Sequence, residues 1–95
     1  MKRRLSRRAR EDLRGIYRWI AQDSPRNAQR VVDRVLEVIE LLASGAVEGP
    51  EIELQDGRKA RTWPAPPYRV YYRRTENLVY ILRVYDQRRR PFVLP

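Results

Sequence analysis

The sequence predicts an α+β fold in which an N-terminal antiparallel helical hairpin packs on a small antiparallel β-sheet. Two amphipathic helical segments come first, and a break of only two residues separates them. The rest of the chain alternates short strand-like runs with turn signals. Because 95 residues match the size of one domain, we expect a single domain over residues 1–95.

The first helix is expected from the capping residue Ser6 to about Gln22, after a short edge strand over residues 1–5. Its apolar residues recur at helical spacing and form one stripe: Ala9, Leu13, Ile16, Tyr17 and Ile20. The opposite side is expected to be an exposed, basic face: Arg7, Arg10, Arg14 and Arg18.

The second helix is expected over residues 25–44, because Ser24 can cap it and Pro25 fits the first helical position. Gly45 suits the left-handed residue that ends a helix. The apolar positions of this helix are Ala28, Val31, Val32, Val35, Leu36, Val38, Ile39 and Leu42. The hairpin can leave spare apolar surface on which a partner helix docks.

The remaining residues predict a meander of strands. Residues 52–54 and 58–63 flank a turn signal, Asp56-Gly57, and residues 68–73 form the next strand. The prolines at 64, 66 and 67 are expected to interrupt regular structure. Residues 78–85 are nearly all apolar, which is typical of a strand covered on both faces. Trp63 fits core packing better than a platform for stacking a nucleic-acid base.

The charge pattern predicts acidic partners. The formal net charge is +9, and 19 of the 21 basic residues are arginine, which suits phosphate and carboxylate recognition. Basic residues gather towards the two ends of the chain and acidic ones in the middle, so the ends can form one basic face. The sequence has no cysteine and no apolar run long enough to span a membrane, and no secretory leader is expected because no apolar region follows the basic N-terminus. We therefore expect a cytoplasmic protein without membrane contact.

The residue types limit the chemistry. Histidine and cysteine are absent, which excludes serine–histidine triads, cysteine nucleophiles and the common zinc sites. The carboxylates have no metal-ligand spacing, so no metal and no cofactor are expected. RNA cleavage would still be open to a tyrosine or a crowded lysine as the base, with arginines supplying positive charge at the phosphate. The residues available for this chemistry are Tyr71, Tyr85, Arg61, Arg69, Arg83 and Arg88; the alternative is that the tyrosines pack and the arginines are solvated.

Arg83 interrupts an apolar strand, so its charge needs a partner. Two interpretations stay open, a structural ion pair with Glu11 or Asp12 and a place at the floor of a functional groove. The run of arginines at 88–90 is either a solvated tail or a contact to phosphate or to an acidic partner segment.

Four segments carry a family resemblance in their order and spacing. They are Leu5-Ser6 with Ala9, Asp12-Leu13 and Ile16; residues 25–28; residues 67–73; and residues 79–84 followed by Asp86-Gln87-Arg88-Arg89. Together they cover about the whole chain, which resembles the RelE/ParE superfamily of toxins from type II toxin–antitoxin systems of the plasmid-stabilisation type. The long helical hairpin with its proline restart favours the ParE-like branch.

The ParE-like resemblance implies a toxin that inhibits DNA gyrase by protein binding, has no catalytic residues of its own, and is neutralised by a cognate antitoxin. It implies contacts to the target or the antitoxin through basic residues: Arg61, Arg69, Arg83, Arg88, Arg89 and Arg90. A homodimer and a toxin–antitoxin hetero-oligomer are both compatible with it.

The RelE-like branch implies instead a metal-independent messenger-RNA endoribonuclease that works on the ribosome. Its catalytic set here would be Arg61, Arg69, Tyr85 and Arg88. Arg69 matches the family's arginine, but the two RelE-type catalytic lysines fall on Ala60 and Thr62. The nearest basic residues, Lys59 and Arg61, are one position away, and such a shift changes the face of a strand.

The ParE-like comparison also has a defect, because ParE-type sequences commonly carry a histidine just after the last strand, where this sequence has Tyr85 and Asp86. Two further alternatives stay open, a non-toxic basic nucleic-acid-binding domain and a degenerate, inactive toxin.

Overall fold

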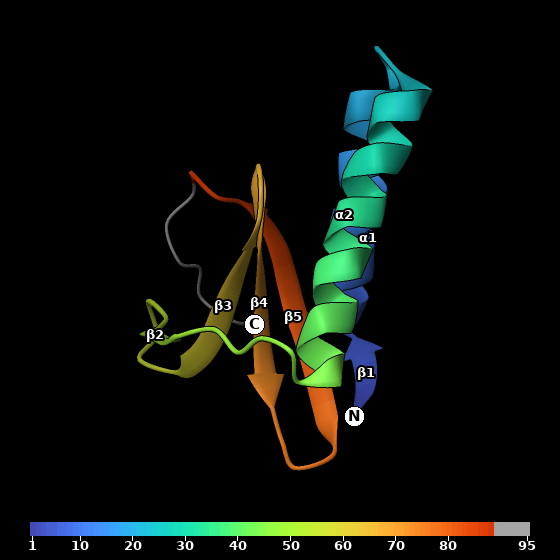
Figure 1. Ribbon diagram of the computed structural model, residues 1–95. Helices are drawn as coiled ribbons and strands as arrows, with labels where there is room; N and C mark the ends of the chain where they lie inside the picture. The colour runs from blue at the N-terminus through green and yellow to red at the C-terminus, as the bar shows by residue number, and fades with distance from the viewer. Residues whose placement is uncertain (89–95) are drawn as a thin grey trace.

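The computed structural model describes residues 1–88, in which two helices lie side by side on one face of a five-stranded sheet (Figure 1). The helices are α1 (Arg7–Ala21) and α2 (Pro25–Ser44). The strands are β1 (Lys2–Leu5), β2 (Glu51–Glu53), β3 (Lys59–Ala65), β4 (Tyr68–Arg74) and β5 (Leu78–Asp86). The predicted α+β class and the order of its elements are confirmed. Within the described residues, no helix is long and apolar enough to cross a membrane.

The sheet has the order β1-β5-β4-β3-β2. Neighbouring strands from β2 to β5 are antiparallel, as expected, but β1 pairs with β5 in parallel, from Lys2 opposite Leu78 to Leu5 opposite Ile81. A parallel neighbour needs a long connection, and the helical hairpin is part of the chain between β1 and β5. In the part of the chain that the structure describes, no strand lies beside the outer edge of β5 beyond Ile81, and α1 lies there instead.

Ser6 fixes α1 to the sheet. Its hydroxyl oxygen accepts a hydrogen bond from the Ala9 N–H at 2.9 Å, which caps the helix, and its hydroxyl donates to the Leu82 carbonyl at 2.8 Å. The Ser6 N–H also donates to the Ile81 carbonyl at 2.9 Å. The second helix begins and ends as predicted, with Ser24 as its cap and Gly45 in the left-handed region at φ 79°.

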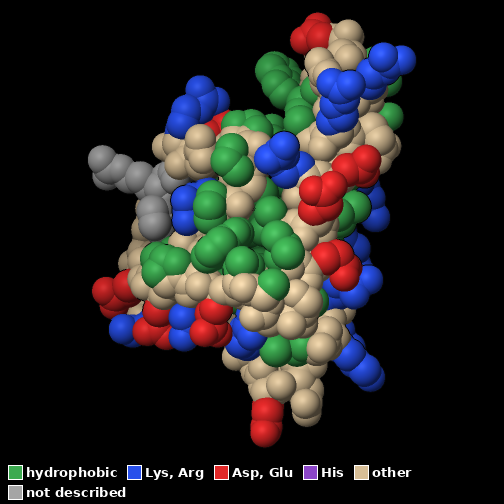
Figure 2. Space-filling model, in the orientation of Figure 1, with side chains coloured by type: hydrophobic (Ala, Val, Ile, Leu, Met, Phe, Trp, Pro, Cys, Tyr) green, Lys and Arg blue, Asp and Glu red, His purple; other side chains and the backbone are tan. Residues whose placement is uncertain are grey.

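The main core lies between the helices and the sheet. Among its buried side chains are Val35, Ile39 and Leu42 from α2 and Tyr72 and Ile81 from the sheet. The partly buried residues packed against this core are Leu5, Leu13, Ile20, Val31, Val47, Trp63 and Tyr68. Trp63 therefore packs, as expected. Figure 2 shows hydrophobic side chains gathered over the strands beside α2, with charged side chains around them.

The structure corrects the expectation for Pro64. Strand β3 continues through this proline to Ala65, and Pro64 pairs with Arg69 of β4. A proline cannot donate to a neighbouring strand, but it is tolerated at a sheet edge. Strand β2 pairs with β3 from Lys59 to Arg61, so within residues 1–88 Pro64 lies on a stretch of β3 that has no strand on its outer side. The interruption occurs only at Pro66 and Pro67.

A smaller core lies on the face opposite the helices, here called the open side of the sheet. Its buried members are Leu54, Ala60, Tyr71 and Leu82, and Ile52, Tyr80 and Tyr85 pack against them. Adjacent residues of a strand point to opposite faces, so Tyr72 joins the main core while Tyr71 joins this one.

Candidate functional site

Two of the predicted site residues meet on the open side. Arg69 of β4 is directly opposite Tyr85 of β5 in the sheet register. The ring of Tyr85 lies edge-on to that of Tyr71, with ring centroids 6.3 Å apart. The guanidinium carbon of Arg83 lies 4.4 Å from the centre of the Tyr85 ring, a cation–π contact. We call these four residues the tyrosine–arginine cluster.

The chemistry of this cluster depends on the environment of Tyr71. Burial raises the pKa of the Tyr71 phenol above the ordinary value of 10.0, and the positive charge of Arg69 opposes that rise. Tyr71 is therefore a neutral phenol at physiological pH. The Nε of Arg69 donates a hydrogen bond to the hydroxyl of the buried Thr62 at 3.1 Å, which fixes the guanidinium against β3.

Arg83 forms the ion pair that one of the two sequence interpretations proposed. Its Nε and Nη2 donate to the two carboxylate oxygens of Asp12 at 2.8 and 2.9 Å, and both side chains are less than 15% exposed. Asp12 also accepts the Val84 N–H at 2.9 Å, so this carboxylate covers the outer edge of β5 beyond β1. The hydrogen bond with Asp12 is the main cause that raises the pKa of Arg83. The partner is Asp12 and not Glu11, which pairs with Arg7.

Arg61 lies apart from the cluster. It is opposite Tyr72 in the sheet register, and Tyr72 belongs to the helix-facing core. Its Nη1 donates to the Gly49 carbonyl at 2.8 Å, and its Nε lies 3.9 Å from a carboxylate oxygen of Glu48. Directly paired residues share a face of the sheet. Arg61 therefore binds and stabilises the loop that follows α2.

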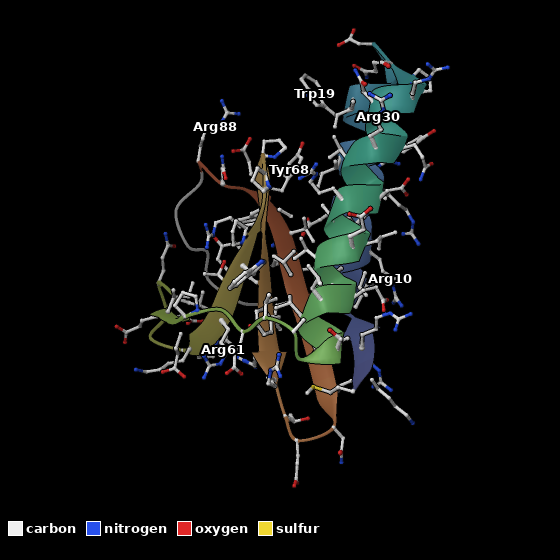
Figure 3. All side chains as sticks on the ribbon, in the orientation of Figure 1. Arg10, Trp19, Arg30, Arg61, Tyr68 and Arg88 are labelled. Carbon is white, nitrogen blue, oxygen red and sulfur yellow. The ribbon has the colours of Figure 1, made fainter. Side chains whose placement is uncertain are left out.

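Arg88 also lies apart, at the end of β5. Its guanidinium and backbone N–H bind the carboxylate of Asp86, with the shortest distance 2.7 Å, and this hydrogen bonding raises the pKa of Arg88. Figure 3 shows Arg88 and Arg61 towards opposite ends of the sheet. The other two predicted tail residues, Arg89 and Arg90, lie outside the described residues. Among residues 1–88, no group of three or more carboxylates is placed to hold a metal ion.

A match to a protein-family model establishes the family of this chain. The family model described as "ParE toxin of type II toxin-antitoxin system, parDE" matches residues 3–91 of the chain. The chain belongs to the ParE toxin family. A solved structure described as "Chromosomal ParDE TA system from P. aeruginosa" matches with a TM-score of 0.72 and 23% sequence identity, over 90% of this chain and 95% of the other. At that identity, the likeness shows a common fold. No curated protein matches the chain in sequence.

Membership in the ParE family makes this chain the toxin component of a type II toxin–antitoxin system, and it implies an antitoxin as partner. In the sequence, the resemblance had already indicated this family. The residues expected to contact the target or the antitoxin stay predictions. The structure brings Arg69 and Arg83 together in the cluster and separates Arg61 and Arg88 from it.

The sequence analysis missed Trp19 on α1, which at 72% exposure is the most exposed large hydrophobic side chain within residues 1–88. Two residues expected in the apolar faces of the helices are also exposed, Tyr17 and Leu36. Trp19 borders a cavity of about 390 Å³ between α1 and the end of β5, together with Tyr68 and Asp86. Figure 3 shows Trp19 and Tyr68 towards the same end of the molecule. The signal in the sequence was a tryptophan outside the apolar stripe.

Proposed function

We propose that this ParE-family toxin inhibits DNA gyrase by binding the enzyme, and that its cognate antitoxin neutralises it. The separation of the candidate catalytic side chains carries the first part of this proposal. Arg69 and Tyr85 lie on the open side, whereas Arg61 lies on the helix-facing side. Cleavage of a phosphodiester needs an acid, a base and cations around one reacting phosphate. Inhibition by binding needs only a complementary surface.

A ribosome-dependent endoribonuclease is the second candidate, and the pairing of Arg69 with Tyr85 favours it. These residues could supply a cation and a phenol on one face of the sheet. The raised pKa of the neighbouring Tyr71 weakens the case, because a phenol that holds its proton more tightly is a poorer general base at neutral pH.

The first experiment separates the two candidates. The purified chain is added to gyrase with plasmid DNA, and in parallel to ribosomes loaded with messenger RNA. Loss of supercoiling with accumulation of cleaved DNA, and intact message, is the expected result. Cleavage of the message at defined positions, with gyrase unaffected, would replace the gyrase proposal with the ribonuclease.

Tyr85→Phe makes the same distinction with one atom. The variant keeps the ring that Arg83 and Tyr71 contact and removes only the hydroxyl. A toxin that acts by binding should keep growth arrest within about twofold, whereas loss of a general acid or base costs a rate factor of about 10²–10⁴. Tyr80→Phe is the matched control on the same strand.

The second part of the proposal places the antitoxin on the exposed apolar residues of the helical hairpin. Four large hydrophobic side chains are exposed there: Tyr17, Trp19, Leu36 and Leu41. Tryptophan is enriched among the residues that dominate binding energy at interfaces. Trp19 stands at the mouth of a cavity that can receive a partner side chain.

Trp19→Ala tests this placement. Because Trp19 is largely exposed, the variant should keep its fold and its toxicity. It should bind the antitoxin at least about tenfold more weakly, since truncation at such a position costs more than about 1.4 kcal/mol. Arg18→Ala, at the adjacent exposed position, is the control. Unchanged neutralisation of Trp19→Ala by the antitoxin would contradict the placement.

A further inference from the structure

A second cavity, of about 410 Å³, opens on the open side of the sheet where β1 leads into α1. Five arginines from separate parts of the chain line it: Arg7 and Arg8 in α1, Arg58 before β3, Arg73 in β4 and Arg83 in β5. No acidic side chain of residues 1–88 lines it. A cavity walled by charges of one sign concentrates ligands of the opposite sign, so this one favours an anion.

Only some of these arginines are neutralised. Asp12 binds Arg83, and Asp56 lies 2.6 Å from a guanidinium nitrogen of Arg58. Within residues 1–88, neither Arg8 nor Arg73 has an acidic partner. The charges of these two side chains are therefore available to a ligand.

The start of α1 adds to the positive charge at the cavity. The first turn of this helix contains no acidic residue and begins with Arg7 and Arg8. A helix carries partial positive charge at this end, so arginines here oppose the helix dipole and lower its stability. An anion in the cavity would relieve this repulsion.

An aromatic ring lies between cations on the same face. Tyr80 of β5 is directly opposite Arg4 of β1 on one side and Arg73 of β4 on the other. Directly paired residues share a face of the sheet, so this partly exposed ring is flanked by two arginines. Proteins that bind single-stranded nucleic acid combine a basic path for the backbone with aromatic rings on which bases stack. An acidic peptide would use the arginines but not the ring.

We propose that this cavity binds the phosphodiester backbone of single-stranded nucleic acid, with Arg8 and Arg73 on phosphates and Tyr80 stacked against a base. The residues involved are distinct from Arg61, Arg69 and Arg88. The inference does not rest on gyrase inhibition, because it concerns free oligonucleotide and the toxin alone.

The test is the fluorescence anisotropy of labelled single-stranded DNA and RNA of one sequence, about twelve nucleotides long, titrated with the full chain at several salt concentrations. Arg8→Gln with Arg73→Gln should weaken binding at least about tenfold. Each lost phosphate contact should also lower the slope of log affinity against log salt by about 0.7, so the pair should lower it by about 1.4. The oligonucleotide that binds more strongly shows whether the site prefers single-stranded DNA or single-stranded RNA.

Arg30→Gln with Arg34→Gln is the matched control. Both residues are exposed on α2 beside another cavity, and the pair removes the same net charge (Figure 3 labels Arg30). It should change the affinity by less than twofold. An equal loss in the two double variants would show attraction by overall charge and would overturn the site.

Tyr80 supplies an independent measurement. Tyr80→Phe should bind as the unmodified chain does, whereas Tyr80→Leu, which keeps an apolar side chain against the small core, should bind several-fold more weakly. Equal binding of Tyr80→Leu would overturn the stacking role. Competition by polyglutamate as strong as by the oligonucleotide would overturn the proposal in favour of an acidic peptide. Circular dichroism establishes that each variant is folded.

Discussion

The two sides of the sheet differ in what their side chains do. The helix-facing side is covered by both helices, and its buried residues are all apolar or aromatic. Among residues 1–88, the core of the open side consists of Leu54, Ala60, Tyr71 and Leu82, and arginines line the cavity that Leu82 borders. Stability therefore resides mainly on the first side, since burial of apolar area is the dominant favourable term in folding. The second side can carry exposed charges that add little to folding.

The two sides are joined at the outer edge of β5, where α1 meets the sheet. There Ser6 binds the backbone at Ile81 and Leu82, and Asp12 binds Arg83 and the backbone at Val84. These contacts hold the start of the basic cavity and the tyrosine–arginine cluster against the helical hairpin. The proposed binding surface therefore depends on a few polar contacts at this edge.

Asp12→Ala should have the largest effect. It leaves the Arg83 charge and the Val84 N–H without their carboxylate partner in a largely buried place. Removing one member of a buried ion pair destabilises a protein by about 3–5 kcal/mol. Urea unfolding monitored by circular dichroism measures the change. Glu11→Ala is the control, because the exposed pair with Arg7 should contribute less than about 0.5 kcal/mol. Equal midpoints for the two variants would contradict this account.

Gly49→Ala should come second and acts on the helix-facing side. A Cβ at Gly49 would lie 1.8 Å from the Thr62 carbonyl oxygen, so the loop must move. The movement would disrupt the Gly49 N–H bond to the Tyr72 hydroxyl and the Arg61 bond to the Gly49 carbonyl. We expect a loss of about 2–3 kcal/mol.

Gly15→Ala is the matched control for that loop substitution. Nothing lies within 4 Å of a Cβ at Gly15 in α1, so alanine should stabilise the helix by about 0.5–1 kcal/mol. Opposite signs for the two glycine variants are the expected result in thermal unfolding. If both variants were destabilised, the close approach of Gly49 to Thr62 would not be the reason that alanine is unfavourable at position 49.

Most of the helix-facing side could be predicted from the sequence because its signals are local. The caps at Ser6 and Ser24, the left-handed Gly45 and the helical spacing of apolar residues each act within a few residues. The continuation of β3 through Pro64, whose partner Arg69 is on the open side, could not be predicted in this way, because whether a strand tolerates proline depends on which neighbour it has in the sheet.

The open side could be predicted only in part because its residues come together through sheet register. Arg69 and Tyr85 were expected to act together, and they are paired. Arg61 was expected with them, but one residue along β3 changes the face. The row of Arg4, Tyr80 and Arg73 joins β1 to the distant hairpin of β4 and β5, and no spacing along the chain indicates it.

Ser6→Ala and Ser24→Ala compare the two helix starts. Ser24 makes one exposed capping bond, so its loss should cost about 0.5–1 kcal/mol. Ser6 makes a cap and also binds Leu82, so its loss should cost about 1–2 kcal/mol. Hydrogen exchange at Val84 should rise only in the Ser6 variant. Equal losses of stability and equal hydrogen exchange at Val84 in the two variants would mean that Ser6 only caps α1 and does not hold the helix against β5.

The smallest expected effect is the dependence of stability on alkaline pH, to which each side of the sheet contributes one tyrosine. Burial is the main cause that raises the pKa of Tyr71 on the open side and of Tyr68 on the helix-facing side. The native chain therefore holds these protons to higher pH than the unfolded chain. Their contribution is fully present below the ordinary pKa of 10.0 and is lost as the pH rises above it.

Arg69→Gln separates the two tyrosines. Arg69 lowers the pKa of Tyr71 and is no cause of the shift at Tyr68, where Asp86 raises and Arg88 lowers the pKa. The variant should therefore move the ionisation of Tyr71 to still higher pH and leave that of Tyr68 in place. Absorbance titration at alkaline pH of the chain with and without Tyr68→Phe or Tyr71→Phe measures each phenol as the difference between two curves, because four other tyrosines titrate in every variant. A shift of both tyrosines would mean that the arginine acts across the sheet, and that the two sides are less independent than their packing indicates.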